Sequence, residues 1–139
     1  MKRAVAFIDG GSRGNPGPAG FGVRIEDDEG RLIAEIREAL GVATNNVAEY
    51  HGLLAALTHL ATHGFHVARI RSDSELLVKQ MRGEYRVKNP GLLPLHREAR
   101  ELAARLDRVT FEHIPRKANA EADRLANLAM DEAALSGEP

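Results

Sequence analysis

Short apolar runs of strand length open this chain and are separated by turn-forming residues. Residues 4–8 form the first run, which ends at Asp9, and residues 20–26 and 32–40 form two more. Asp27, Asp28 and Gly30 between the last two favour a turn, so we expect a hairpin there.

The segment between the first two predicted strands, residues 10–18, is rich in glycine and proline. A glycine-rich loop after a strand can bind phosphate, but a dinucleotide-binding loop must open directly into a helix. Pro16 and Pro18 argue against such a helix, because proline lacks the backbone donor that a helix interior needs. We therefore interpret this segment as a connecting loop.

Helical periodicity begins after the third predicted strand. The apolar positions that recur at helical spacing are Tyr50, Leu53, Leu54, Leu57, Leu60 and Ala61. They predict an amphipathic helix over residues 47–63, with Gly64 as its stop and Asn45 or Asn46 as its N-cap.

Strands and helices alternate in the second half of the chain. The pattern predicts a strand over residues 67–72, a short helix over 74–81, a helix over 92–106, a strand over 109–114, a helix over 119–134 and a frayed tail over 136–139. A hairpin followed by such alternation predicts an α/β fold with a five-stranded mixed sheet, three antiparallel strands then two parallel, and helices on both faces. We expect residues 1–139 to form one domain.

Composition narrows the function less than the pattern does. The 19 basic and 20 acidic residues nearly cancel, so any nucleic-acid site must come from local clustering. The sequence has no cysteine, which excludes disulfides and thiolate chemistry. The apolar run directly before Asp9 has only five residues, 4–8, too few for a signal peptide or a membrane span. We expect a cytoplasmic protein with no membrane contact and favour a monomer.

Four carboxylates lie at edges of the predicted core. Asp9 and Asp73 directly follow apolar strands, while Glu49 and Asp123 lie early in predicted helices beside the apolar stripe. If the four converge, hard divalent cations would offset their repulsion, and two ions roughly 4 Å apart could activate water against a phosphodiester. Aspartate is also a common turn former, and acidic residues are favoured near helix starts. The spacing alone leaves both interpretations open.

Four segments of the chain resemble the signatures of the ribonuclease HI family. They are FIDGGSRGNPGPAGFG at residues 7–22, TNNVAE at 44–49, SDS at 72–74 and NAEADRLA at 119–126. The resemblance spans nearly the whole chain and implies a ribonuclease H-like fold. It implies an endonuclease that cuts the RNA strand of RNA–DNA hybrids, leaves a 5′-phosphate, and uses two Mg²⁺ or Mn²⁺ ions. The metal ligands implied are Asp9, Glu49, Asp73 and Asp123.

The resemblance also implies substrate contacts. Asn15, Asn45 and Asn46 would contact the hybrid, and Thr44 with Asn89 would hold a DNA phosphate. Asparagine amides can both donate to and accept from ribose 2′-hydroxyls in a shallow minor groove. For Asn15 and Asn45 taken singly, turn or cap chemistry is the alternative.

The chain also departs from the best-known bacterial members of the family. It lacks their flexible loop with an active-site histidine, and Arg116 is our candidate replacement, with Lys117 as the alternative. It lacks their basic protrusion as well and keeps only Arg82, Arg86 and Lys88 as a local cluster, so we expect weaker hybrid binding. Similar short forms resemble archaeal members, some of which also cut double-stranded RNA.

Two rival functions share this fold. One is a catalytically weak nucleic-acid-binding module, against which the four intact carboxylates argue, since a pure binder has no need of all four. The other is a nuclease of the integrase or junction-resolvase kind, against which the ribose-contact signature around Asn15 and residues 44–46 argues.

Overall fold

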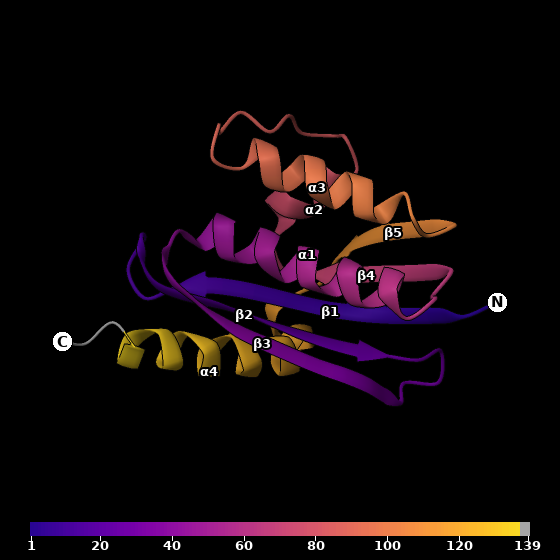
Figure 1. Cartoon of the computed structure of the whole chain (residues 1–139), viewed down its shortest axis with the longest axis horizontal. Coiled ribbons are helices and arrows are strands. Elements are labelled where there is room, and N and C mark those ends of the chain that lie inside the picture. The colour runs from indigo at the N-terminus through magenta and orange to yellow at the C-terminus, as the bar shows by residue number, and fades with distance from the viewer. Residues whose placement is uncertain (137–139) are drawn as a thin grey trace.

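Five strands form one mixed sheet in the computed structural model, which describes residues 1–136 (Figure 1). The elements in chain order are β1 Arg3–Ser12, β2 Gly17–Glu26, β3 Leu32–Ala43, α1 Asn45–Thr62, β4 Val67–Ser72, α2 Glu75–Met81, α3 Leu93–Ala103, β5 Arg108–His113, the 3₁₀ helix η1 Arg116–Asn119 and α4 Ala120–Ser136. Within these residues, no helix combines the length and the apolar character that crossing a bilayer requires.

The strand order across the sheet is β3-β2-β1-β4-β5. β2 pairs antiparallel with β1 and β3, whereas β4 pairs parallel with β1 and β5. This arrangement confirms the predicted mixed sheet. It also places the carboxyl ends of β1 and β4 side by side, where sites gather in open α/β sheets.

Helices cover both faces of the sheet, as predicted (Figure 1). α1 packs on β1 and β2 and is covered in turn by α3, while α4 packs on the opposite face against β1, β2 and β3. The α1 side chains Tyr50, Leu53, Leu57 and Leu60 are at most 1% exposed, so the helical stripe read from the sequence is the inner face of α1.

The first three strands are longer than predicted. β1 runs past Asp9 to Ser12, and its pairs with β2 continue through Gly10↔Phe21 to Ser12↔Ala19. The connecting loop therefore shrinks to residues 13–16 and, as expected, opens into a strand rather than a helix. Glycines are poor strand formers, which is why the sequence pattern ends the strand too early.

Glycines in β2 serve the packing of α4. A Cβ on Gly22 would lie 2.5 Å from the Ala122 carbonyl oxygen and from Leu125 Cβ, and one on Gly20 would lie 2.5 Å from Ala129 Cβ. α4 can therefore approach β2 more closely than any side chain would allow.

Several element ends differ from the prediction. The N-cap of α1 is Thr44, whose hydroxyl accepts from the Val47 backbone N–H at 3.2 Å, so the prediction of Asn45 or Asn46 is wrong. Gly64 does end the helix, with a φ of 72° and its N–H donating to the Ala61 carbonyl.

Further along the chain, α3 stops three residues early at Ala103, and β5 starts and stops one residue early. The last helix begins as η1 and extends through Ser136, a residue of the predicted tail. The rest of the predicted tail, residues 137–139, lies outside the described residues.

Candidate active site

All four candidate carboxylates line one open pocket of about 480 Å³. Asp9 comes from β1, Glu49 from α1, Asp73 from the residue after β4, and Asp123 from the first turn of α4. Elements that are distant in sequence thus bring these four residues together.

The sheet register aligns the two aspartates. The β1–β4 ladder ends at the pair Ile8↔Ser72, so Asp9 and Asp73 are the next residues of two neighbouring parallel strands. Asp9 remains paired with Gly22 of β2 on its other side, whereas Asp73 has left its strand. Both carboxylates therefore emerge at the same edge of the sheet.

Gly10 brings Glu49 to the same edge. A Cβ on Gly10 would lie 2.5 Å from the carbonyl carbon of Ala48 and 2.6 Å from the backbone nitrogen of Glu49. The absence of that atom lets the first turns of α1 press against β1 directly beside Asp9. The position of Glu49 thus depends on a glycine of β1 as much as on its own helix.

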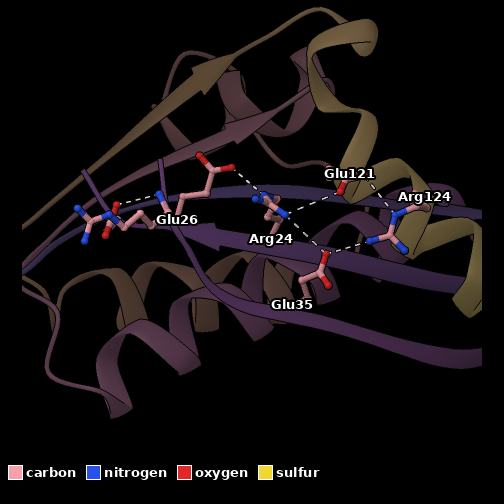
Figure 2. A network of polar contacts seen from close by, with 7 residues as sticks. Arg24, Glu26, Glu35, Glu121 and Arg124 are labelled. Carbon is pink, nitrogen blue, oxygen red and sulfur yellow. Dashed lines mark hydrogen bonds and ion pairs between the residues drawn. The ribbon is translucent and has the colours of Figure 1, made fainter. Parts of the chain in front are cut away.

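Ion pairs tie the first turn of α4, which carries Asp123, to the neighbouring strands (Figure 2). The network joins β2, β3 and α4 through five side chains: Arg24, Glu26, Glu35, Glu121 and Arg124. Arg124 Nη2 lies 2.9 Å from Glu35 Oε2, and Arg24 Nη1 lies 3.8 Å from Glu121 Oε1. Such partly exposed pairs contribute little stability, but they orient the turn that carries Asp123.

Two of the four acids have strongly perturbed protonation. Burial, followed by repulsion from Asp73, raises the pKa of Asp9 to about 8, and a hydrogen bond with Asp123 adds to the rise. Burial raises the pKa of Glu49 to about 7, against a hydrogen bond with Ser74 that lowers it. The fold therefore gathers more negative charge than the pocket can hold at neutral pH without a cation.

The donor set fits a hard divalent cation, because every candidate ligand is a carboxylate oxygen. Within residues 1–136, no three acidic, histidine or cysteine side chains already stand close enough to enclose one ion. The carboxylates instead ring an open pocket. Mg²⁺ commonly takes one or two protein carboxylates and completes its shell with water and substrate phosphate, so an open ring suits it.

Other predicted site residues lie at the same pocket. Asn45, Asn46 and Arg116 line it. The Asn45 side-chain oxygen accepts from the Ser12 backbone N–H at 2.8 Å, which ties the start of α1 to the end of β1. The Arg116 guanidinium lies 3.8 Å from Asp123 Oδ1, and its side chain is 83% exposed, so it is free to turn toward a ligand.

Three predicted substrate contacts do not line the pocket, and each supports local backbone structure. Thr44 caps α1, and the Asn15 side-chain oxygen accepts from the Asn45 backbone N–H at 3.0 Å. The Asn89 side-chain oxygen accepts from the Gly91 N–H at 2.8 Å in the segment between α2 and α3. Substrate contact by these residues stays a prediction.

Sequence reasoning missed two asparagines at the site. Asn127 lines the pocket, and its amide donates to the Asp123 backbone carbonyl at 2.9 Å; its spacing four residues after Asp123 was the available signal. Asn119 is only 1% exposed and donates toward Asp73. Its signals were its place as the first residue of the family signature at 119–126 and its polarity where the buried stripe of the last helix begins.

Known proteins are similar to this chain in sequence and in fold. A family model described as reverse transcriptase-like matches residues 7–129. The bifunctional protein Rv2228c of Mycobacterium tuberculosis is 49% identical over 135 residues, 96% of this chain but 37% of that relative. Ribonuclease HI of Halobacterium salinarum is 44% identical over 131 residues, 94% of this chain and 66% of that relative. The chain thus spans little more than a third of the mycobacterial relative.

Solved structures agree with these relatives. The N-terminal ribonuclease H domain of Rv2228c superposes with a TM-score of 0.96 at 47% identity, covering 99% of this chain and 100% of that one. LC11-RNase H1, determined in complex with an RNA/DNA hybrid, superposes with a TM-score of 0.89 at 42% identity, covering 94% and 99%. On the strength of the family match and of these likenesses, the chain belongs to the ribonuclease H family.

Proposed function

We propose that this chain is a metal-dependent endoribonuclease that hydrolyses the RNA strand of RNA–DNA hybrids by a two-metal-ion mechanism. The observation that carries the proposal is the convergence of Asp9, Glu49, Asp73 and Asp123, from four separate elements, on one open pocket. A structural role does not account for this convergence, because burying and crowding carboxylates raises the free energy of the folded state.

The relatives support the choice of substrate. One relative is named a ribonuclease HI, and another was determined with an RNA/DNA hybrid bound. The pocket rim is consistent with such a ligand, since Asn45 and Asn46 present amides there. Amides can distinguish RNA from DNA through the ribose 2′-hydroxyl, which both donates and accepts.

The four carboxylates and Arg116 have different parts in the proposed mechanism. Divalent ions, when bound, would supply the chemistry of activating a water and stabilising the leaving oxygen of the phosphodiester. The four carboxylates would hold those ions, and the register of β1 and β4 fixes the relative height of Asp9 and Asp73. Arg116 brings a mobile positive charge to the rim beside Asp123, where it would position the attacking water or help the product leave.

The test is a cleavage assay on four labelled substrates: RNA–DNA hybrid, double-stranded RNA, single-stranded RNA and DNA duplex. Each is incubated with Mg²⁺, with Mn²⁺ or with chelator. We expect cleavage of the RNA strand of the hybrid with either ion and none in chelator. Additional cleavage of double-stranded RNA would widen the substrate class, whereas hybrid binding without cleavage would make the chain a binding module and contradict the proposal.

A further inference from the structure

Asn119 is the last residue of η1, and its side chain contacts the candidate active site at Asp73. Its side chain is only 1% exposed, and its amide nitrogen lies 2.8 Å from the Ile8 backbone carbonyl oxygen and 3.4 Å from Asp73 Oδ2. Ile8 immediately precedes Asp9. A single amide group therefore touches the peptide that leads into one candidate metal ligand and the carboxylate of another.

This contact lies where the sheet stops holding the two strands together. The β1–β4 ladder ends at Ile8↔Ser72, and the Ser72 carbonyl accepts from the Ile114 N–H at 2.9 Å. Beyond that pair, no β1–β4 ladder pair fixes Asp73 relative to Asp9 among the described residues. The two Asn119 hydrogens bridge that gap.

The chemistry requires a donor with two hydrogens. The Ile8 carbonyl and the Asp73 carboxylate both accept, so turning the amide over would set its oxygen against theirs. The orientation that serves them leaves the Asn119 side-chain oxygen without a hydrogen-bond partner, the one such buried side-chain atom among residues 1–136. An unpaired buried acceptor is unfavourable for folding, so stability alone does not explain an asparagine here.

We propose that Asn119 is a positioning residue that fixes the Asp73 carboxylate relative to Asp9 and thereby sets the affinity of the pocket for divalent cations. The inference rests on the proposed function, because it assumes that these carboxylates bind metal. A hydrogen-bonding partner behind a ligand typically changes metal affinity by about 10- to 100-fold when it is removed.

The test is Asn119→Leu, which keeps the number and branching of the side-chain heavy atoms and removes both N–H donors. Calorimetric titration of the nucleic-acid-free protein with Mn²⁺ measures metal affinity without any turnover. We expect the dissociation constant to rise by about tenfold or more. The metal concentration for half-maximal hybrid cleavage should rise in parallel, while KM for the hybrid at saturating metal should stay unchanged.

The controls separate positioning from simple loss of stability. Leu60→Val weakens the core near the C-terminal end of α1, eleven residues after Glu49, so it should lower the melting temperature and leave Mn²⁺ affinity unchanged. If Asn119→Leu does not fold, Asn119→Ala replaces it in the same titration. A wild-type protein that neither binds Mn²⁺ nor cleaves the hybrid would refute the proposed function. Tight wild-type binding that the Asn119 variant matches would refute the positioning role alone.

Discussion

Asp9 and Asp73 follow the last residue pair of two parallel strands, and after burial the repulsion from Asp73 is the largest cause of the raised pKa of Asp9. The register of the sheet therefore places two carboxylates, Asp9 and Asp73, where they repel each other. A cation bound between such carboxylates offsets their repulsion, so metal binding, folding stability and protonation should be linked in this protein.

Replacing a carboxylate by its amide tests the proposed metal ligands directly. We expect Asp73→Asn or Asp9→Asn to lower hybrid cleavage by about a thousandfold or more, because the amide supplies no anionic oxygen and each 1.36 kcal/mol of lost transition-state stabilisation is a factor of ten. Circular dichroism should show an intact fold. Asp131→Asn is a matched control on α4, where Asp131 pairs with Arg13 at 2.8 Å, and should cleave normally. Near-normal turnover by either site variant would overturn the mechanism.

Arg116 at the pocket rim should act on turnover rather than on affinity. If it positions water or helps the product leave, Arg116→Ala lowers kcat far more than it raises KM for the hybrid. Lys117→Ala is the matched control, because Lys117 is the neighbouring cation and does not line the pocket. Steady-state kinetics on the hybrid measures both constants. If Arg116→Ala raises KM and leaves kcat unchanged, Arg116 is a phosphate contact. If Lys117→Ala lowers kcat more than Arg116→Ala does, the proposed role belongs to Lys117.

Gly10 should be essential for the approach of α1. In Gly10→Ala the new methyl meets backbone atoms of Ala48 and Glu49 at 2.5–2.6 Å, so we expect the free energy of unfolding to fall by about 1–3 kcal/mol. Gly11→Ala meets side chains rather than backbone, Met130 at 3.4 Å and Asn45 Oδ1 at 3.7 Å, and serves as the control in the same urea titration. Equal stability of the two variants would mean that α1 adjusts freely and that its contact with β1 does not fix Glu49.

Sequence alone predicted the sheet, its helices and the four carboxylates, because apolar periodicity and the family signatures are local properties of the chain. It shortened β1 at Asp9, since glycines that serve a neighbouring helix look like loop residues. It placed the cap on Asn45 or Asn46 rather than on Thr44, because several adjacent residues were good capping types. Asn119 escaped notice because its partners, Ile8 and Asp73, are distant in sequence.

Without metal, stability should depend on pH through Asp9 and Glu49. The pKa of Asp9 is raised from 3.8 to about 8, so the folded state binds this proton more tightly than the unfolded state. The stabilising contribution is complete below about pH 4 and is lost as the pH rises through about 8. In chelator, we expect a higher melting temperature at pH 6 than at pH 9. A melting temperature that rises over this interval would show that other groups dominate.

The last prediction follows from the same crowding of charge. Asp9→Asn removes the most strongly perturbed acid, so in chelator at neutral pH the variant should melt at a higher temperature than wild type. Added Mg²⁺ should raise the melting temperature of wild type more than that of the variant and so offset part of this difference. A cation that binds only the folded state stabilises it by about 2.7 kcal/mol at a hundredfold excess over Kd, and a lost ligand weakens that binding.

Thermal scans of both proteins, with chelator and with Mg²⁺, separate the two effects, and Asp131→Asn again serves as the control because Asp131 lies outside the pocket lining. The metal-induced rise in melting temperature should be large in wild type and in Asp131→Asn and small in Asp9→Asn. If wild type is the more stable protein in chelator and Mg²⁺ shifts neither midpoint, the four acids do not form a metal cluster. In that case the repulsion that raises the pKa of Asp9 is relieved by protonation alone.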